Sequence, residues 1–130
     1  MDIVSDSRHA PNDFGKLEKS LDPDWWKKIF NLIYLKTDAD VVLNEKLTRF
    51  EVDIVINSLD LDRDERLLDV CCGRGRHVLE LAKRGFRYVE GLDYSNVLIG
   101  VAKKRADSLG LKVSFKVGDA RTLPYPDSCF

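Results

Sequence analysis

The sequence predicts an α/β fold, in which parallel strands alternate with helices around one sheet. From residue 66 onward, short apolar runs alternate with segments that have the period of an amphipathic helix. Both helical segments end at a glycine, Gly85 and Gly110, the residue that best tolerates the left-handed conformation after a helix. Acidic residues, Asp93 and Asp119, lie where the second and third apolar runs end. This order of strands and helices is the first half of a doubly wound parallel sheet.

The composition fits one globular unit with its own core. The 130 residues are 44% hydrophobic and carry a net charge of −1, so no overall field favours a nucleic acid or an anionic membrane surface. Three cysteines, two of them adjacent at Cys71 and Cys72, form neither a disulfide framework nor a zinc spacing. No apolar run is long enough to span a bilayer. We therefore expect a soluble, cytoplasmic protein without a metal site.

The N-terminal part divides into a tail and a helical region. Residues 1–20 are polar and show no sustained period, so we expect a flexible tail. Residues 21–62 are expected to form two helices that act as a lid over the binding edge of the sheet. The first begins with Asp22 as its cap and has apolar side chains every four residues, at Trp25, Ile29 and Ile33. The second has its apolar stripe at Leu43, Leu47, Phe50 and Ile54.

Three strands and two helices are expected in residues 63–130. The run "RLLDVCC" from Arg66 to Cys72 is nearly continuous in apolar residues, as in a strand covered on both faces. A helix over "RHVLELAKR" leads to the second strand, "YVEGLDY". Ser95 is then placed to cap the second helix. The strictly alternating "KVSFKVGDA" predicts a third strand at an edge of the sheet.

A ligand is expected outside the carboxyl ends of the strands, beside the first strand, where the winding of such a sheet reverses. Gly73 and Gly75 occupy this place, and without side chains they let a ligand approach the backbone closely. Asp93 lies twenty positions after Gly73, at the end of the second strand. A carboxylate at that position can accept both hydroxyl hydrogens of a ribose, which predicts an adenosine-type ligand.

The end of the third strand is expected to supply the binding site for the adenine. Asp119 is placed to accept a hydrogen bond from an adenine amino group, and the Ala120 amide to donate one to a ring nitrogen. Tyr94 offers an apolar face to the same ring. A nicotinamide dinucleotide is the alternative ligand, but Val78 replaces the third glycine of its fingerprint. Asp69, close to the loop, also favours an ammonium-bearing ligand over a pyrophosphate.

The series "LLDVCCGRGRH", "GLDYS" and "VGDA", in this order and spacing, resembles the S-adenosylmethionine-dependent methyltransferases of the Rossmann-like class. The resemblance implies a three-layer sandwich, S-adenosylmethionine as cofactor and an acceptor that we expect to be a small molecule. It assigns Asp69 and the loop from Gly73 to Gly75 to the methionine portion of the cofactor, and it supports the ribose and adenine roles given above. Cys71 stands where the family usually has a glycine, and Tyr34 matches a lid tyrosine that sometimes contacts the ligand.

The family's sheet has seven strands, so we expect residues 63–130 to be the N-terminal half of its domain, truncated after the third strand. The catalytic residues would then lie beyond Phe130, and the unpaired side of the first strand would favour self-association. Two alternatives remain: an NAD(P)-binding oxidoreductase fragment, and a non-catalytic nucleotide-binding or assembly module. His77 is expected to pack or cap rather than act as a base. A solvated helix face is expected at Lys103, Lys104 and Arg105.

Overall fold

The computed structural model describes residues 19–130. Apart from Lys19 and Ser20, the expected tail at residues 1–20 lies outside the described residues. The described part contains six helices and three strands in the order α2 (Trp26–Ile29), α3 (Tyr34–Thr37), α4 (Ala39–Val42), α5 (Glu45–Leu59), β1 (Arg66–Val70), α6 (Arg76–Lys83), β2 (Tyr88–Asp93), α7 (Asn96–Ser108) and β3 (Ser114–Val117).

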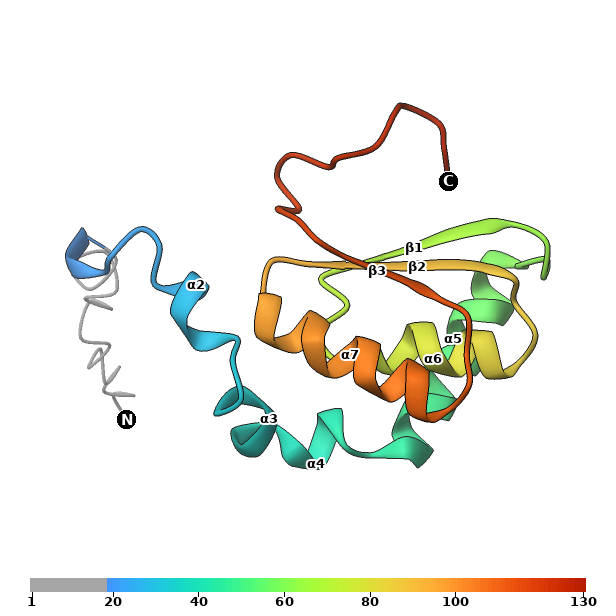
Figure 1. Ribbon diagram of the computed structural model, residues 1–130, viewed down its shortest axis with the longest axis horizontal. Coiled ribbons are helices and arrows are strands. Elements are labelled where there is room, and N and C mark those ends of the chain that lie inside the picture. The colour runs from blue at the N-terminus through green and yellow to red at the C-terminus, as the bar shows by residue number, and fades with distance from the viewer. Residues whose placement is uncertain (1–18) are drawn as a thin grey trace, which may run out of the picture.

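The three strands form one parallel sheet in the order β1-β2-β3. Arg66 pairs with Tyr88 at one end of β1, and Asp93 pairs with Val117 at the carboxyl end of the sheet. All three strands therefore end on the same side of the molecule (Figure 1). The predicted α/β class and the edge position of the third strand are confirmed.

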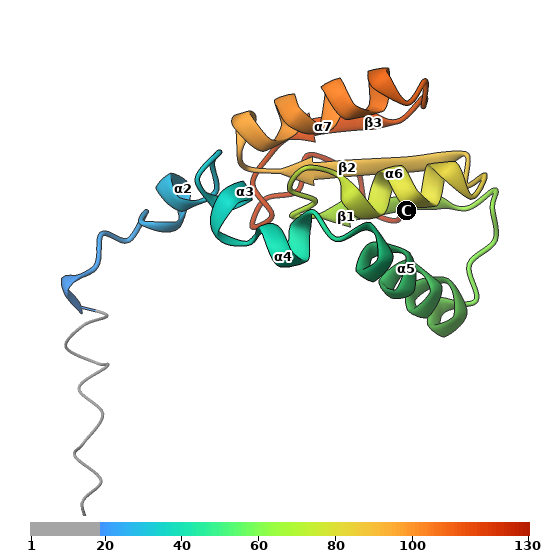
Figure 2. The same cartoon turned by 90° about the horizontal axis from the view of Figure 1, so that it is seen from below.

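Helices cover one face of this sheet within residues 19–130. Figures 1 and 2 show α5, α6 and α7 in a row beneath the strands, while α2, α3 and α4 lie toward the end where the strands stop. The buried core joins the two layers, because Val78 of α6 and Ala102 of α7 are both 0% exposed and pack with Val89 and Phe115 of the sheet. The described part thus holds the sheet and one of the two helical layers of the implied sandwich.

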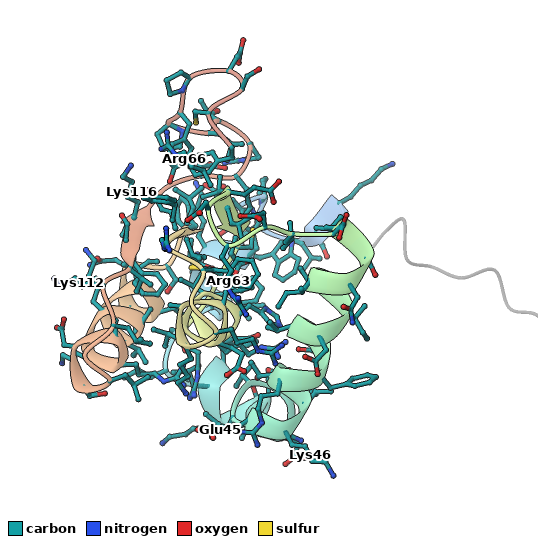
Figure 3. The ribbon with its side chains drawn as sticks, turned by 90° about the vertical axis from the view of Figure 1, so that its right-hand side faces the viewer. Glu45, Lys46, Arg63, Arg66, Lys112 and Lys116 are labelled. Atoms are coloured by element: carbon teal, nitrogen blue, oxygen red, sulfur yellow. The ribbon has the colours of Figure 1, made fainter. Side chains whose placement is uncertain are left out.

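The chain after β3 crosses the opposite face of the sheet. The Tyr125 hydroxyl donates a hydrogen bond to the Glu90 carboxylate, and the Lys116 ammonium lies 4.7 Å from the centre of the Tyr125 ring. Arg66 lies against the Phe130 ring at 5.2 Å, and Figure 3 shows Arg66 and Lys116 beside this segment. Among the described residues, no helix has the length and apolar character needed to cross a membrane.

The expected first helix is interrupted. Helix α2 ends at Ile29, and Asn31 then accepts a hydrogen bond from the Ile33 amide at 2.7 Å and donates one to the Lys28 carbonyl at 2.8 Å. An asparagine side chain that satisfies nearby backbone groups in this way competes with the helical pattern. Asp22 likewise accepts from the Asp24 amide at 2.9 Å, before a turn rather than at a helix start. The prediction of one continuous helix here is wrong.

The apolar stripe predicted for the second helix is also wrong. Phe50 is 60% exposed and Ile54 is also exposed, whereas Thr48 and Val52 are the buried residues of α5. The face of α5 that carries Thr48 and Val52 lies toward α6. Ion pairs hold it there, because Glu51 pairs with residues of α6 and Asp53 pairs with Arg84, which follows α6. As a result, α5 packs beside α6 in the helical layer, and the segment near the strand ends consists of α2 to α4 (Figure 2).

Candidate functional site

The loop after β1 forms a tight turn that leads into α6. The Cys72 amide donates to the Leu92 carbonyl at 3.0 Å, and the Gly75 amide donates to the Cys72 carbonyl at 2.9 Å. Gly73 and Gly75 both have positive φ angles, of 54° and 73°, and Gly75 is the residue that precedes α6. The sequence thus forms a left-handed turn at the carboxyl end of the sheet, where glycine is the least strained residue.

The two glycines of this loop serve different purposes. A Cβ atom on Gly73 would meet only Leu98 Cδ1 at 4.0 Å, so the space beside Gly73 is open. A Cβ atom on Gly75 would lie 2.6 Å from the Phe115 ring and 3.2 Å from the Ala102 Cβ. Gly75 is therefore required by the packing of the loop on α7 and β3, and its contact with a ligand stays a prediction.

Asp93 holds the loop to the next helix. Its side chain is buried at the end of β2, accepting hydrogen bonds from the Gly73 amide and the Ser95 amide, each at 2.8 Å. The Ser95 hydroxyl accepts from the Leu98 amide at 3.2 Å, which confirms the predicted cap. The same hydroxyl donates to the Phe30 carbonyl at 2.6 Å, so the start of α7 also anchors the segment between α2 and α3.

A cleft of about 240 Å³ opens at the carboxyl ends of β2 and β3. It brings together five residues singled out in the sequence, namely Cys71, Asp93, Tyr94, Asp119 and Ala120. The remaining lining residues are Trp26, Leu92, Gly118 and Arg121. Tyr94 supplies an aromatic wall and the two aspartates supply acceptor groups, so the cleft has the chemistry to hold a flat, hydrogen-bonding base joined to a sugar.

Asp69 lies on β1 and does not line the cleft. Its Oδ2 atom is buried without a hydrogen-bond partner among the described residues. Burial raises the pKa of the Asp69 carboxyl, and the nearby His77 and Arg76 act in the opposite direction. A buried carboxylate oxygen without a donor is unfavourable in a folded protein. An ammonium-bearing ligand at the loop would relieve this, and in this respect the residues fit S-adenosylmethionine.

Comparison with known proteins gives the family. A family model described as a methyltransferase domain matches residues 67–130. The 27-O-demethylrifamycin SV methyltransferase of Amycolatopsis mediterranei is 30% identical over 95% of this chain, which spans 47% of that enzyme. The ajmaline N-methyltransferase of Rauvolfia serpentina is 40% identical over 52% of this chain, which covers 24% of that enzyme. The chain belongs to the class I S-adenosylmethionine-dependent methyltransferases.

A solved structure agrees with this assignment, although the protein that it shows is described as a cyclase. The crystal structure of the [4+2]-cyclase SpnF superposes with a TM-score of 0.60 and is 37% identical, over 63% of this chain and 31% of that one. The protein therefore spans less than half the length of each of these relatives.

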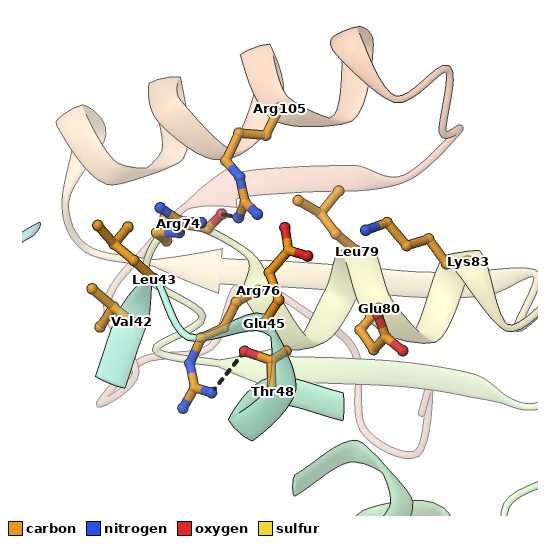
Figure 4. A pocket seen from close by; sticks show the side chains of 10 residues that line it. All are labelled: Val42, Leu43, Glu45, Thr48, Arg74, Arg76, Leu79, Glu80, Lys83 and Arg105. Atoms are coloured by element: carbon orange, nitrogen blue, oxygen red, sulfur yellow. Dashed lines mark hydrogen bonds between the residues drawn. The ribbon is translucent and has the colours of Figure 1, made fainter. Parts of the chain in front are cut away.

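In this methyltransferase-family chain, an arginine of α7 braces the loop. Arg105 of α7 donates to the Arg74 carbonyl at 3.2 Å, and Figure 4 shows the two arginines beside each other at a small cavity. Burial lowers the pKa of both guanidinium groups, with Glu45 acting in the opposite direction. Arg105 is therefore not part of a purely solvated face, as the basic run had suggested, whereas Lys103 and Lys104 are exposed.

The start of α6 is fixed from α5. Glu51 accepts a hydrogen bond from Arg76 and pairs with His77 Nε2 at 2.8 Å. Arg76 also donates to the Thr48 hydroxyl at 3.2 Å (Figure 4 shows the last contact). The hydrogen bond from Arg76 lowers the pKa of Glu51. His77 is thus tied to a carboxylate on a neighbouring helix, in agreement with its expected packing role.

Tyr34 lies on α3 and is half-buried. Its ring meets Phe30 edge to face, with 5.2 Å between the ring centres. Burial raises the pKa of its hydroxyl, as do the negative charges of Asp38 and Asp93, while Arg76 lowers it. Tyr34 is not among the residues that line the cleft. Its contact with a ligand remains a prediction.

Trp26 and Arg121 are the site residues that the sequence did not reveal. The Trp26 ring meets Tyr94 edge to face at 4.9 Å, and the ring centre lies 5.0 Å from the Arg121 guanidinium carbon. An apolar stripe cannot distinguish a buried tryptophan from one at a cleft. For Arg121 the only signal was its spacing from Asp119, which places an acid and a base two residues apart in a turn.

Replacing Cys71 by glycine is expected to stabilise the fold. Its φ angle is +61°, a left-handed conformation in which a side chain is strained. We expect Cys71→Gly to raise the free energy of unfolding by about 1 kcal/mol, since strain relief exceeds the added chain entropy. Urea titration measures this. Cys71→Ala, which keeps a Cβ atom, is the control, and an equal gain in both variants would contradict backbone strain as the cause.

Proposed function

We propose that residues 63–130 form the cofactor-binding part of an S-adenosylmethionine-dependent methyltransferase, with the segment from α2 to α4 as its lid, and that its acceptor is a small molecule. The observation that carries the proposal is the cleft at the carboxyl ends of β2 and β3, where Asp93, Tyr94 and Asp119 converge. The names of two relatives support the acceptor class, because they are methyltransferases of 27-O-demethylrifamycin SV and of ajmaline.

Each part of the cofactor has a proposed binding group. Asp93 would bind the ribose hydroxyls, while it remains anchored by the Gly73 and Ser95 amides. Tyr94 and Ala120 would enclose the adenine, with Asp119 accepting from its amino group. The open space beside Gly73 and the unpaired Asp69 oxygen would suit the methionine portion with its ammonium group.

The chemical task of the protein is to align the acceptor with the methyl group of the cofactor. When bound, the cofactor would supply an electrophilic methyl group on its sulfonium, for transfer to the acceptor with S-adenosylhomocysteine as the leaving group. The residues of this chain would hold the cofactor's ribose and base in one orientation and exclude water from the cleft. No proton acceptor for the methyl acceptor is assigned within residues 19–130. The reducing cytoplasm is the proposed location, in keeping with the free thiols at Cys71, Cys72 and Cys129.

The dinucleotide alternative has no support in the packing. Val78, at the position of the third fingerprint glycine, is 0% exposed in the core between α6 and the sheet. A glycine there would leave a cavity, so the close helix approach that the fingerprint needs is replaced by side-chain packing. A different caution comes from SpnF, because a protein 37% identical to this one is described as a cyclase. Cofactor binding and methyl transfer must therefore be tested separately.

The test uses S-adenosylmethionine labelled in its methyl group. We expect the 130-residue chain to bind the cofactor saturably. We expect little methyl transfer to a panel of amines, phenols and hydroxyl compounds, since acceptor contacts in the family come from later strands. No cofactor binding would overturn the proposed function, and robust turnover by this chain would show that residues 1–130 suffice for catalysis.

Asp69→Asn should separate stability from binding. Burial raises the folded-state pKa of Asp69 above its ordinary value of 3.8, so Asp69 favours folding at low pH and loses that contribution as pH rises through the raised pKa. We expect the asparagine variant to be more stable by roughly 1 kcal/mol at pH 7, with the difference vanishing in acid. The same variant should bind S-adenosylhomocysteine more weakly. Denaturant curves at several pH values check the first part, and a stability gain independent of pH would refute it.

We propose that the 130-residue chain self-associates along β1. Within residues 19–130 this strand pairs only with β2, and Val70 is 39% exposed near its end. An unpaired strand edge is a template for another chain. We expect light scattering to show oligomers, and Val70→Lys, which places a charge on the edge, to shift the chain toward monomer. Val97→Lys, at an exposed position of α7, is the control, and a monomeric wild-type chain would contradict the proposal.

A further inference from the structure

Arg121 connects two segments that are far apart in the sequence. It follows β3, and its guanidinium carbon lies 5.0 Å from the centre of the Trp26 ring on α2. Trp26 in turn meets the Tyr94 ring edge to face at 4.9 Å. Figures 1 and 2 place α2 beside the carboxyl ends of the strands, and Trp26, Tyr94 and Arg121 all line the cleft there.

The same guanidinium forms an ion pair with Asp119, an acid that lines the cleft. Arg121 donates from Nε to Asp119 Oδ1 at 3.0 Å and from Nη2 to Asp119 Oδ2 at 2.6 Å. The Arg121 amide also donates to Asp119 Oδ1 at 2.9 Å. These hydrogen bonds lower the pKa of Asp119 to about 2, so the carboxylate stays an acceptor across the physiological range. A fork of two donors also fixes the plane of the carboxylate, which a lysine would not do.

These contacts give Arg121 a place in the binding cycle. A guanidinium over an indole ring is attracted by the ring's negative face, although the attraction is modest for exposed groups. Arg121 is largely exposed in this ion pair, so the contact can break and re-form. Trp26 can then move away from the cleft and return, while Asp119 accepts a hydrogen bond from the adenine of the ligand.

We propose that Arg121 is a positioning residue that fixes Asp119 toward the base of the bound ligand and holds Trp26 closed over it. The inference rests on the proposed function for its ligand, an adenosine-bearing molecule. In this proposal, the contact that closes the cleft joins Arg121, in the cofactor-binding part, to Trp26, in the lid. A ligand that has entered is retained by this contact, so its loss should act mainly on the dissociation rate.

The experiment uses the 130-residue chain with Trp25→Phe, which leaves Trp26 as the single tryptophan. In this background, Arg121→Gln removes the charge and Arg121→Lys keeps it without the planar fork. Arg87→Gln is the matched control, because Arg87 also pairs with a nearby acid, Asp64 at 2.7 Å, but lies before β2 at the other end of the sheet. The probe is S-adenosylhomocysteine, and circular dichroism checks that each variant is folded.

We expect Arg121→Gln to raise the Kd for S-adenosylhomocysteine about threefold to tenfold through faster dissociation, with Arg121→Lys in between and Arg87→Gln unchanged. In the ligand-free Arg121→Gln protein, Trp26 emission should shift to the red and acrylamide should quench it more strongly. If emission, quenching and dissociation rate all match the parent, the inference is overturned while the proposed function stands. If the parent binds no S-adenosylhomocysteine, the proposed function falls, and Trp26 emission still decides whether Arg121 holds the lid.

Discussion

Asp93→Ala is expected to weaken binding of S-adenosylhomocysteine by about 1–3 kcal/mol, the scale for losing a hydrogen-bonded charged group. It should also destabilise the fold, because the Gly73 and Ser95 amides both donate to this carboxylate at 2.8 Å. The variant leaves these two amides without their acceptor and frees the loop from the start of α7. Calorimetry measures the affinity, and urea titration measures the free energy of unfolding.

Two further variants interpret that result. Asp93→Asn keeps a side-chain oxygen that can accept from one amide, so it should retain more stability than Asp93→Ala while still losing affinity. Asp107→Ala, on the exposed side of α7, is the surface control and should change neither quantity. An Asp93→Ala protein that binds as tightly as the parent would remove Asp93 from the site.

Gly75→Ala is expected to cost about 3 kcal/mol of folding free energy. The new methyl group would lie 2.6 Å from the Phe115 ring at a φ of +73°, so a steric clash adds to backbone strain. Gly100→Ala is the matched control, because nothing lies within 4 Å of its Cβ position in α7 and alanine is the better helix former. Thermal unfolding of the two variants checks the contrast. Equal stability of Gly75→Ala and the parent would mean that the loop does not pack on β3 as described.

The fold was predictable where local chemistry and long-range packing agree. Ser95 caps α7 and Gly85 follows α6 with a positive φ angle, as the sequence indicates, because both roles depend on a few neighbouring residues. The orientation of α5 was not predictable, since two adjacent stripes on that helix have helical spacing. Ion pairs from Glu51 and Asp53 to α6 select between them, and such pairs join residues far apart in the sequence.

Some features of the candidate site were likewise predictable from the sequence, and others were not. Parallel strands bring their carboxyl ends together, so placing Asp93 and Asp119 near one another required only the strand assignments. The purpose of Gly75 could not be read from the sequence, because Phe115, which needs the space, lies on another strand. The pairing of Trp26 with Arg121 depends on where a short, interrupted helix meets the turn after β3, which no periodicity encodes.

Calorimetric titration of the 130-residue chain with S-adenosylhomocysteine and, separately, with NAD tests the central claim most directly. Asp69, Val78 and Asp93 around the Gly73 loop favour the first ligand, so we expect saturable binding of one S-adenosylhomocysteine per chain and much weaker or no binding of NAD. Saturable NAD binding with none for S-adenosylhomocysteine would contradict the account.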